Sequence, residues 1–307
     1  MRADRWISGI EWGVVALLVA ADVAFAAMTG IPVVNWQRRT LAIALLVALW
    51  PATLLLTRLA GRAGDASFLA EIPGKAFAYI AAATICEYYC ATSQAPLHDP
   101  LLIRLDGLLG VRWTDLYALA DAHPGIRDVL SYVYFSLGSE TCLVLGIIAV
   151  FYPRRARRFT TALIVSSLLT IPFLWLFPVA GPLVAFPDLP ASVYSDVVYR
   201  LGPEHYMAMR NHVFSAIDMS NLGGIVSFPS YHAASAVMLA YFLRGVRFLF
   251  PAAAAFNAVM IAATPIIGGH YIVDVIAGVL VGAATIAVIE WIETDRAPAR
   301  GGVLASA

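Results

Sequence analysis

Long apolar segments dominate the sequence and constrain the fold more than any other feature. About 20 consecutive apolar residues are enough to cross the hydrocarbon core of a bilayer as an α-helix. Eight segments approach this length, covering residues 10–29, 41–58, 76–93, 128–152, 159–179, 231–246, 248–267 and 271–292. The sequence therefore predicts an all-α integral membrane protein with about eight transmembrane helices.

The composition agrees with this fold class. Hydrophobic residues make up 61% of the chain and charged residues only 13%, more apolar side chain than a soluble domain of 307 residues can bury. The apolar runs are continuous, whereas the strands of a membrane barrel would alternate between apolar and polar positions. The formal net charge is zero, so no overall field attracts nucleic acid.

The distribution of basic residues predicts the orientation of the spans. If the eight spans alternate in direction, most flanking basic residues fall on one side, which is expected to be cytoplasmic. These residues are Arg2, Arg5, Arg58, Arg62, Lys75, Arg154, Arg155, Arg157, Arg158, Arg244, Arg247, Arg296 and Arg300. Both termini are then cytoplasmic, and the spans that begin near residues 231 and 271 start at the outer face. We expect two N-terminal transmembrane helices in residues 1–74, a larger membrane domain in 75–293 and a flexible tail in 294–307.

Two segments between the spans have a different character. Residues 95–126 mix leucines with charged residues, which predicts short amphipathic helices at the outer interface. Residues 180–230 form a long segment rich in proline and glycine, which is typical of a lid or a binding loop.

A histidine and an aspartate lie four residues apart at the start of the last span. His270 follows two glycines, and Asp274 comes one helical turn later on the same helix face. Asp274 is expected to hold one ring nitrogen of His270, leaving the other free to attack or to accept a proton. The alternative is an interfacial histidine with an acidic residue nearby by chance.

A second histidine, His232, lies at the start of the sixth span in the motif Phe-Pro-Ser-Tyr-His, residues 228–232. Ser230 is expected to cap this helix, and free N–H groups in its first turn form an anion site. His232 is then placed to donate a proton to a leaving oxygen, although an ordinary helix cap is the alternative. Together the two helix starts direct positive dipole ends at one pocket, which suits a phosphate ester.

The two histidine motifs resemble those of the type-2 phosphatidic acid phosphatase (PAP2) superfamily in residues, order and separation. Residues 228–232 and 269–274 carry the resemblance, which extends over residues 95–292 and implies a six-helix catalytic core. Residues 177–182 and 98–115 are similar to segments of one branch, the inositol phosphorylceramide synthases and sphingomyelin synthases.

This resemblance implies a role for each of three residues. His270 would take the phosphoryl group as a phosphohistidine, and Asp274 would orient its ring. His232 would protonate the departing alcohol and later activate the acceptor. No metal and no other cofactor is implied.

The chain departs from the broad superfamily pattern at its basic residues. Seven and eight residues after Lys75, where the superfamily carries Arg-Pro, stand two alanines, and Thr264 replaces an arginine upstream of His270. The phosphate therefore lacks charged partners, and we expect Arg210 to replace them; a solvated loop arginine is the alternative. Further candidates are Ser230, Tyr231, Gly269 and Tyr271 for phosphate binding, and Glu87 and Glu140 for headgroup or acceptor contacts.

These observations predict a membrane enzyme that acts on a lipid-linked phosphate at the outer face. Water as acceptor would make it a lipid phosphatase, and an alcohol would make it a phosphosphingolipid or phosphoinositide headgroup synthase. The rival from another class is a proton-coupled transporter with a His/Asp relay; an inactive scaffold of the same fold is a further alternative.

Arginine- and alanine-rich usage is typical of a GC-rich bacterium, which places the site in the periplasm. The expected partners are the membrane and a lipid phosphate but no nucleic acid, and homo-oligomerisation is left open.

Overall fold

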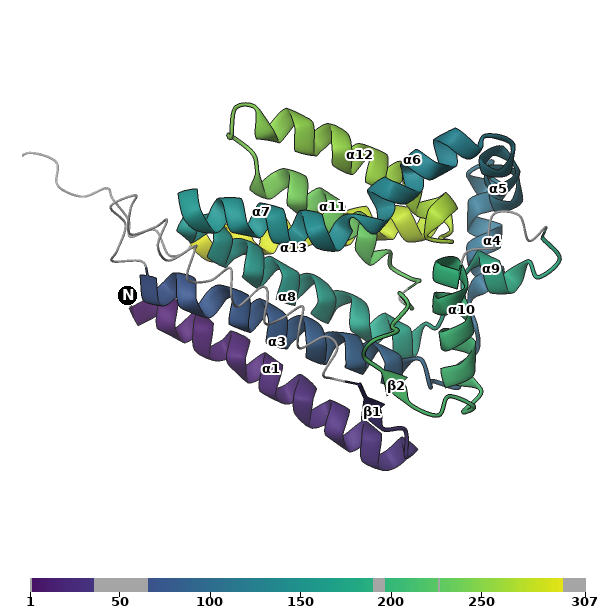
Figure 1. The fold of residues 1–307 in the computed structure, drawn as a ribbon, viewed down its shortest axis with the longest axis horizontal. Coiled ribbons are helices and arrows are strands. Elements are labelled where there is room, and N and C mark those ends of the chain that lie inside the picture. Colours follow the sequence, from purple (N-terminus) through teal and green to yellow (C-terminus); the bar gives the residue numbers. More distant parts are fainter. Residues whose placement is uncertain (1, 36–65, 190–196, 226, 295–307) are drawn as a thin grey trace, which may run out of the picture.

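A computed structural model describes residues 2–35, 66–189, 197–225 and 227–294, and it is a bundle of long helices (Figure 1). Its helices are α1 (Arg2–Thr29), α3 (Ala66–Cys90), α4 (Asp99–Leu108), α5 (Trp113–Ala122), α6 (Pro124–Phe135), α7 (Leu137–Phe151), α8 (Pro153–Leu176), α9 (Pro182–Ala185), α10 (Val197–Arg210), α11 (Tyr231–Phe242), α12 (Leu249–Ile267) and α13 (Ile272–Thr294). Two short strands, β1 (Val33–Val34) and β2 (Ile217–Asp218), pair in parallel. The predicted all-α class is confirmed. The predicted span 41–58 lies outside the described residues, as does the tail from residue 295.

Several helices are long and apolar enough to cross a membrane, so the protein is a multi-pass membrane protein. Within the described residues, four helices meet this criterion, and the pair α6 and α7, bent by 48°, makes a fifth if it is one span. The four segments are Ser8–Thr29, Pro153–Leu176, Leu249–Ile267 and Ile272–Ile292. They match predicted spans closely, whereas the predicted straight span at 128–152 is broken by this bend.

The sixth predicted span is shorter than expected. Helix α11 has 12 residues and ends at Phe242, and Gly245 follows with a left-handed φ of 78°. At about 1.5 Å per residue the helix is roughly 18 Å long, less than the thickness of about 30 Å of the hydrocarbon core. It contacts α7, α8, α12 and α13, so it lies in the interior of the bundle.

Glycines allow α11 and α13 to approach each other closely. A Cβ atom added to Gly278 would lie 2.2 Å from the carbonyl oxygen of Ser230, and one added to Gly282 would lie 2.7 Å from that of Ala234. Backbone atoms cannot yield as flexible side chains do, so larger residues would push the helices apart. These glycines hold together the two helices whose N-terminal ends carry the histidine motifs.

Helices α4, α9 and α10 lie across one end of the long helices (Figure 1). The predicted segment 95–126 forms two short helices, α4 and α5, and the predicted loop 180–230 contains α9, α10 and β2. Pairing of β1 with β2 fastens the segment after α1 to this region. The location of these elements at the outer interface stays a prediction.

Two basic residues, Arg155 at the start of α8 and Arg244 after α11, lie close together at one end of the bundle. The Arg155 guanidinium donates hydrogen bonds to the carbonyl oxygens of Phe242 and Arg244, at 3.2 and 2.7 Å. Arg244 in turn lies 3.1 Å from a carboxylate oxygen of Glu290, near the end of α13. The loops after α7 and after α11 therefore lie at the same end, as the alternation of spans requires.

Helix α1 is joined to α3 by a buried ion pair between Glu11 and Lys75, at 2.5 Å. Farther along, the Tyr89 hydroxyl donates a hydrogen bond to the carbonyl oxygen of Ile31, at 2.8 Å. The first helix thus packs directly on the rest of the bundle. The division of the chain at residues 74 and 75 stays a prediction.

Candidate active site

The turn between α12 and α13 places His270 against Asp274. Gly269 has a left-handed φ of 62°, which lets the chain turn sharply before α13 begins. His270 Nδ1 lies 3.6 Å from Asp274 Oδ2, and both residues are buried. The same carboxylate oxygen accepts a hydrogen bond from the Tyr271 N–H at 2.8 Å, which fixes its position. With Nδ1 facing the carboxylate, Nε2 is the nitrogen left for chemistry.

This pair carries unused hydrogen-bonding capacity. Among the described residues, neither His270 Nδ1 nor Asp274 Oδ1 has a hydrogen-bond partner, although both atoms are buried. At 3.6 Å the imidazole and carboxylate are too far apart for a hydrogen bond but close enough to attract once the ring is protonated. Buried polar atoms without partners are costly, and they are common at functional sites.

Ser230 caps α11 and fastens it to α13. Its hydroxyl accepts a hydrogen bond from the Ala233 N–H at 3.4 Å, which agrees with the predicted cap. Its own N–H donates to the main-chain oxygen of Asp274 at 3.0 Å. The start of α11, which carries His232, is therefore joined to the helix that follows His270.

Tyr134 of α6 shows that the two histidines converge. Its ring stacks face-on against the His232 imidazole, with centroids 3.9 Å apart and an interplanar angle of 10°. A Cβ atom added to Gly268 would lie 2.7 Å from the Tyr134 hydroxyl and 2.8 Å from Cδ2 of His270, so these two atoms are at most about 5.5 Å apart. The structure therefore brings both imidazoles close to Tyr134.

Two buried aspartates on α4 hold the backbone around His270. Asp106 accepts hydrogen bonds from the N–H groups of Ile272 and Val273, at 2.8 and 2.9 Å. Asp99 accepts from the N–H groups of Ala180 and Gly181, at 3.0 and 2.8 Å. Helix α4 thereby ties the proline-rich turn and the first turn of α13 into one unit.

The Asp106 bonds change the expected anion site. The sequence predicted that both helix starts direct positive dipole ends at one pocket, and at α13 the N–H groups of the first turn are already bonded to carboxylates. Asp106 occupies the N–H groups of Ile272 and Val273, and Asp274 occupies that of Tyr271. Carboxylates of the protein itself therefore accept the hydrogen bonds that the N-terminal end of this helix could otherwise donate to a phosphate.

We expect Asp106→Asn to destabilise the protein and to lower its activity. Burial raises the pKa of Asp106, and its two backbone hydrogen bonds oppose that shift. An asparagine amide keeps one acceptor but turns a donor toward a buried N–H, which should lower the apparent Tm in detergent by about 5 °C. The exposed Asp115, paired with the exposed Arg112, offers Asp115→Asn as a matched control that changes little. Equal Tm values for the two variants would contradict this role.

The remaining phosphate-binding candidates have other contacts in the structure. Arg210 donates hydrogen bonds to the carbonyl oxygens of Ser93 and Ala95, at 2.5 and 2.7 Å, and so holds the turn after α3. The Tyr271 hydroxyl donates to Asp99 at 3.1 Å. The Tyr231 hydroxyl lies near serines of α8. Phosphate contacts by these residues stay predictions.

The two glutamates lie within the bundle. Glu140 of α7 accepts a hydrogen bond from Asn257 of α12 at 2.6 Å, and its second oxygen has no partner in the described part of the chain. Glu87 of α3 interacts electrostatically with Tyr231, the residue before His232. Their proposed contacts with a headgroup or an acceptor stay predictions.

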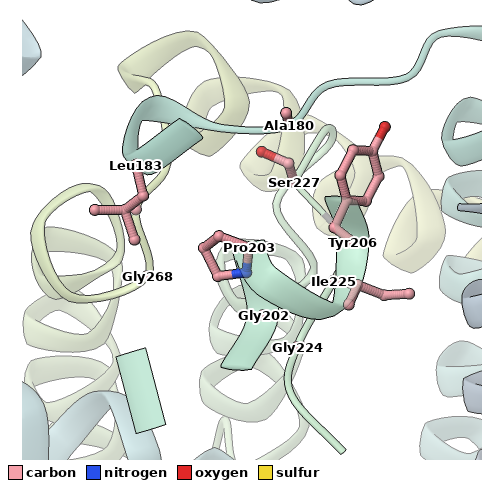
Figure 2. Close-up of a pocket in the computed structure, with 10 residues that line it drawn as sticks. Ala180, Leu183, Gly202, Pro203, Tyr206, Gly224, Ile225, Ser227 and Gly268 are labelled. Atoms are coloured by element: carbon pink, nitrogen blue, oxygen red, sulfur yellow. The ribbon is translucent and has the colours of Figure 1, made fainter. Parts of the chain in front are cut away.

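A small, partly open pocket adjoins the glycines before His270 (Figure 2). It is lined by Ala180, Leu183, Gly202, Pro203, Tyr206, Gly224, Ile225, Ser227, Gly268 and Gly269. Figure 2 shows the Tyr206 and Ser227 side chains on one side of the view and Leu183 on the other. Burial raises the pKa of Tyr206 to about 12, so its hydroxyl stays protonated at neutral pH. The pocket next to the His270 turn is therefore lined by hydroxyl groups and small residues.

The described residues contain no group of three or more His, Cys, Asp or Glu side chains placed to hold a metal ion. The paired imidazoles and the single carboxylate beside them are nevertheless potential ligands. The absence of a metal requirement stays a prediction.

A helical, multi-pass membrane protein with two imidazoles and a carboxylate at one end of the bundle is consistent with a phosphoryl-transfer enzyme. A family model described as the PAP2 superfamily matches residues 100–288, more than half of the chain. The protein belongs to the PAP2 superfamily, and this membership supports a phosphatase-type activity on lipid phosphates. No match was found among the curated proteins or among the solved structures.

The matched range contains both histidine motifs, Tyr134 and all of α4 except its first residue, Asp99. Sequence reasoning identified the histidines and Asp274 but missed Tyr134, Asp99 and Asp106. Tyr134 lies among other aromatic residues near the bend between α6 and α7, and the aspartates lie in a mixed apolar and charged segment. Nothing in their local spacing distinguished them from interfacial residues.

Proposed function

We propose that the protein transfers a phosphoryl group or phospho-headgroup from a lipid through a phosphohistidine on His270, with the active site facing outward from the cytoplasm. The observation that carries this proposal is the convergence of His232 and His270 beside Tyr134. Family membership supports an enzyme over the transporter alternative.

The geometry is consistent with a defined role for each group. His270 Nε2 attacks phosphorus while the bond from phosphorus to the leaving oxygen breaks, and His232 donates the proton that this oxygen needs. Asp274 faces Nδ1 and stabilises the positive charge that develops on the ring. In the second step His232 takes a proton from the acceptor, whose oxygen displaces His270 from phosphorus. Phosphate is released if the acceptor is water, and a new phosphodiester is released if an alcohol accepts a phospho-headgroup from His270.

One observation favours a headgroup synthase as the second candidate. The two segments that resemble the inositol phosphorylceramide and sphingomyelin synthase branch, residues 98–115 and 177–182, contact each other through Asp99. Asp99 also accepts a hydrogen bond from Tyr271, next to the proposed nucleophile. Both segments thus build the surroundings of His270, which supports placement in that branch.

The test uses the purified protein in detergent with three lipid substrates. These are phosphatidic acid, diacylglycerol pyrophosphate, and phosphatidylinositol together with ceramide. Released phosphate would identify a phosphatase, and a new phospholipid that forms only with ceramide would identify a synthase. EDTA should leave the activity unchanged. Inhibition by EDTA with rescue by zinc or magnesium would contradict the metal-free scheme, and absence of any product would contradict the proposed function.

A further inference from the structure

We infer that Tyr134 is a positioning residue that holds the His232 ring toward His270 by face-on stacking. This inference rests on the proposed function, because it names the residue that sets the orientation of the proposed acid. The stacked arrangement places the two rings 3.9 Å apart and nearly parallel, at 10°. Such close, parallel contact restricts rotation of the imidazole about its side-chain bonds.

Stacking is the contact that can orient this ring. Among the described residues, no side chain forms a hydrogen bond with the half-buried His232 imidazole. Histidines that act as proton donors are usually oriented by a partner on the second ring nitrogen. Here an aromatic face takes the place of that partner.

Tyr134 also reaches the nucleophile, which distinguishes it from an ordinary packing residue. Its hydroxyl and Cδ2 of His270 approach the same point beside Gly268. In an imidazole ring Cδ2 is bonded to Nε2, the nitrogen that Asp274 leaves free. Tyr134 therefore contacts one histidine with its ring, and its hydroxyl lies within about 5.5 Å of Cδ2 of the other.

The fold supports this position from both sides. Tyr134 is 8% exposed and packs in a cluster with Trp113 and Ile267. The indole N–H of Trp113 donates a hydrogen bond to the carbonyl oxygen of Pro265 at 2.8 Å, so α5 is fastened to the last turn of α12. The helix break after Phe135, where α6 and α7 bend by 48°, follows directly on Tyr134.

The test separates the ring of Tyr134 from its hydroxyl. Tyr134→Phe keeps the stacking surface, and Tyr134→Leu removes it while keeping an apolar side chain of moderate size. Tyr132, on the same helix and 76% exposed, provides Tyr132→Phe and Tyr132→Leu as matched controls. The measurement is the rate of lipid phosphate turnover, with kcat and KM determined separately.

We expect Tyr134→Leu to lower kcat by about 100-fold with KM within about threefold, because misplacing a reacting group by about 1 Å has an effect of this size. The loss should be largest for phosphatidic acid, whose alkoxide must be protonated, and small for an aryl phosphate with a nitrophenol leaving group. Tyr134→Phe should retain most of the activity, and both Tyr132 variants should match the unaltered protein. Equal losses for both Tyr134 variants, or equal losses for both leaving groups, would overturn the inference.

A second readout does not depend on turnover. Diethyl pyrocarbonate modifies neutral imidazoles, and mass spectrometry can follow the reaction at His232 alone. Tyr134→Leu should accelerate this modification by uncovering one ring face, whereas Tyr134→Phe should leave it unchanged. An unchanged rate in Tyr134→Leu would contradict the inference even if the proposed reaction is never observed. Failure of the unaltered protein to turn over any lipid phosphate would instead contradict only the proposed function.

Discussion

His270→Ala is expected to abolish turnover and the labelling of the protein by substrate phosphate. The variant lacks the Nε2 atom that would bond to phosphorus, and Asp274 then faces a cavity. The measurement is incubation with lipid carrying labelled phosphate, followed by an alkaline quench that preserves phosphohistidine and by counting of protein-bound label.

His123→Ala provides the control for this experiment. His123 is exposed at the end of α5, and one of its ring nitrogens lies 3.0 Å from the carbonyl oxygen of Leu119 in the same helix. This variant should label as strongly as the unaltered protein. Equal labelling of the protein and of His270→Ala would rule out a phosphohistidine at this position.

His232→Ala should slow the first chemical step by about 10²–10⁴-fold for phosphatidic acid, the usual contribution of a general acid. The reason is that the departing glycerol oxygen is a poor leaving group without a proton. An aryl phosphate needs far less protonation, so its cleavage should be much less affected. Rates of single-turnover labelling with both substrates measure this difference directly.

The second step provides a further check on His232. Since the same imidazole would activate the acceptor, the variant should accumulate phosphohistidine when an aryl phosphate is supplied. A loss of the same factor for both substrates, with no accumulation of label, would show that His232 acts through folding rather than through proton transfer.

The sequence predicted those features that depend on short-range patterns. Runs of apolar residues indicated spanning helices because the free energy of transferring a side chain into lipid depends mainly on that side chain and not on distant contacts. The four-residue spacing of His270 and Asp274 placed both on one helix face, and the structure brings them to 3.6 Å. Ser230 acts as a cap for the same local reason.

Features that depend on distant contacts could not be predicted in this way. The bonds between Asp106 and the first turn of α13 join residues 166 positions apart, and an aspartate in a mixed segment is equally compatible with a solvated surface. Tyr134 is a similar case, since its stacking on His232 depends on how α6 packs beside α11. The early end of α11 also depends on packing, because α11 is enclosed by neighbouring helices and not by lipid.

The hydrogen bond from the Ser230 N–H to the main-chain oxygen of Asp274 has a practical consequence. This hydrogen bond uses only backbone atoms, so a substitution of the Asp274 side chain leaves it in place. A protein with Asp274→Asn should therefore stay assembled while its proposed chemistry is impaired. Such a slow variant is suited to capturing an unreacted lipid from a native membrane, which mass spectrometry could then identify.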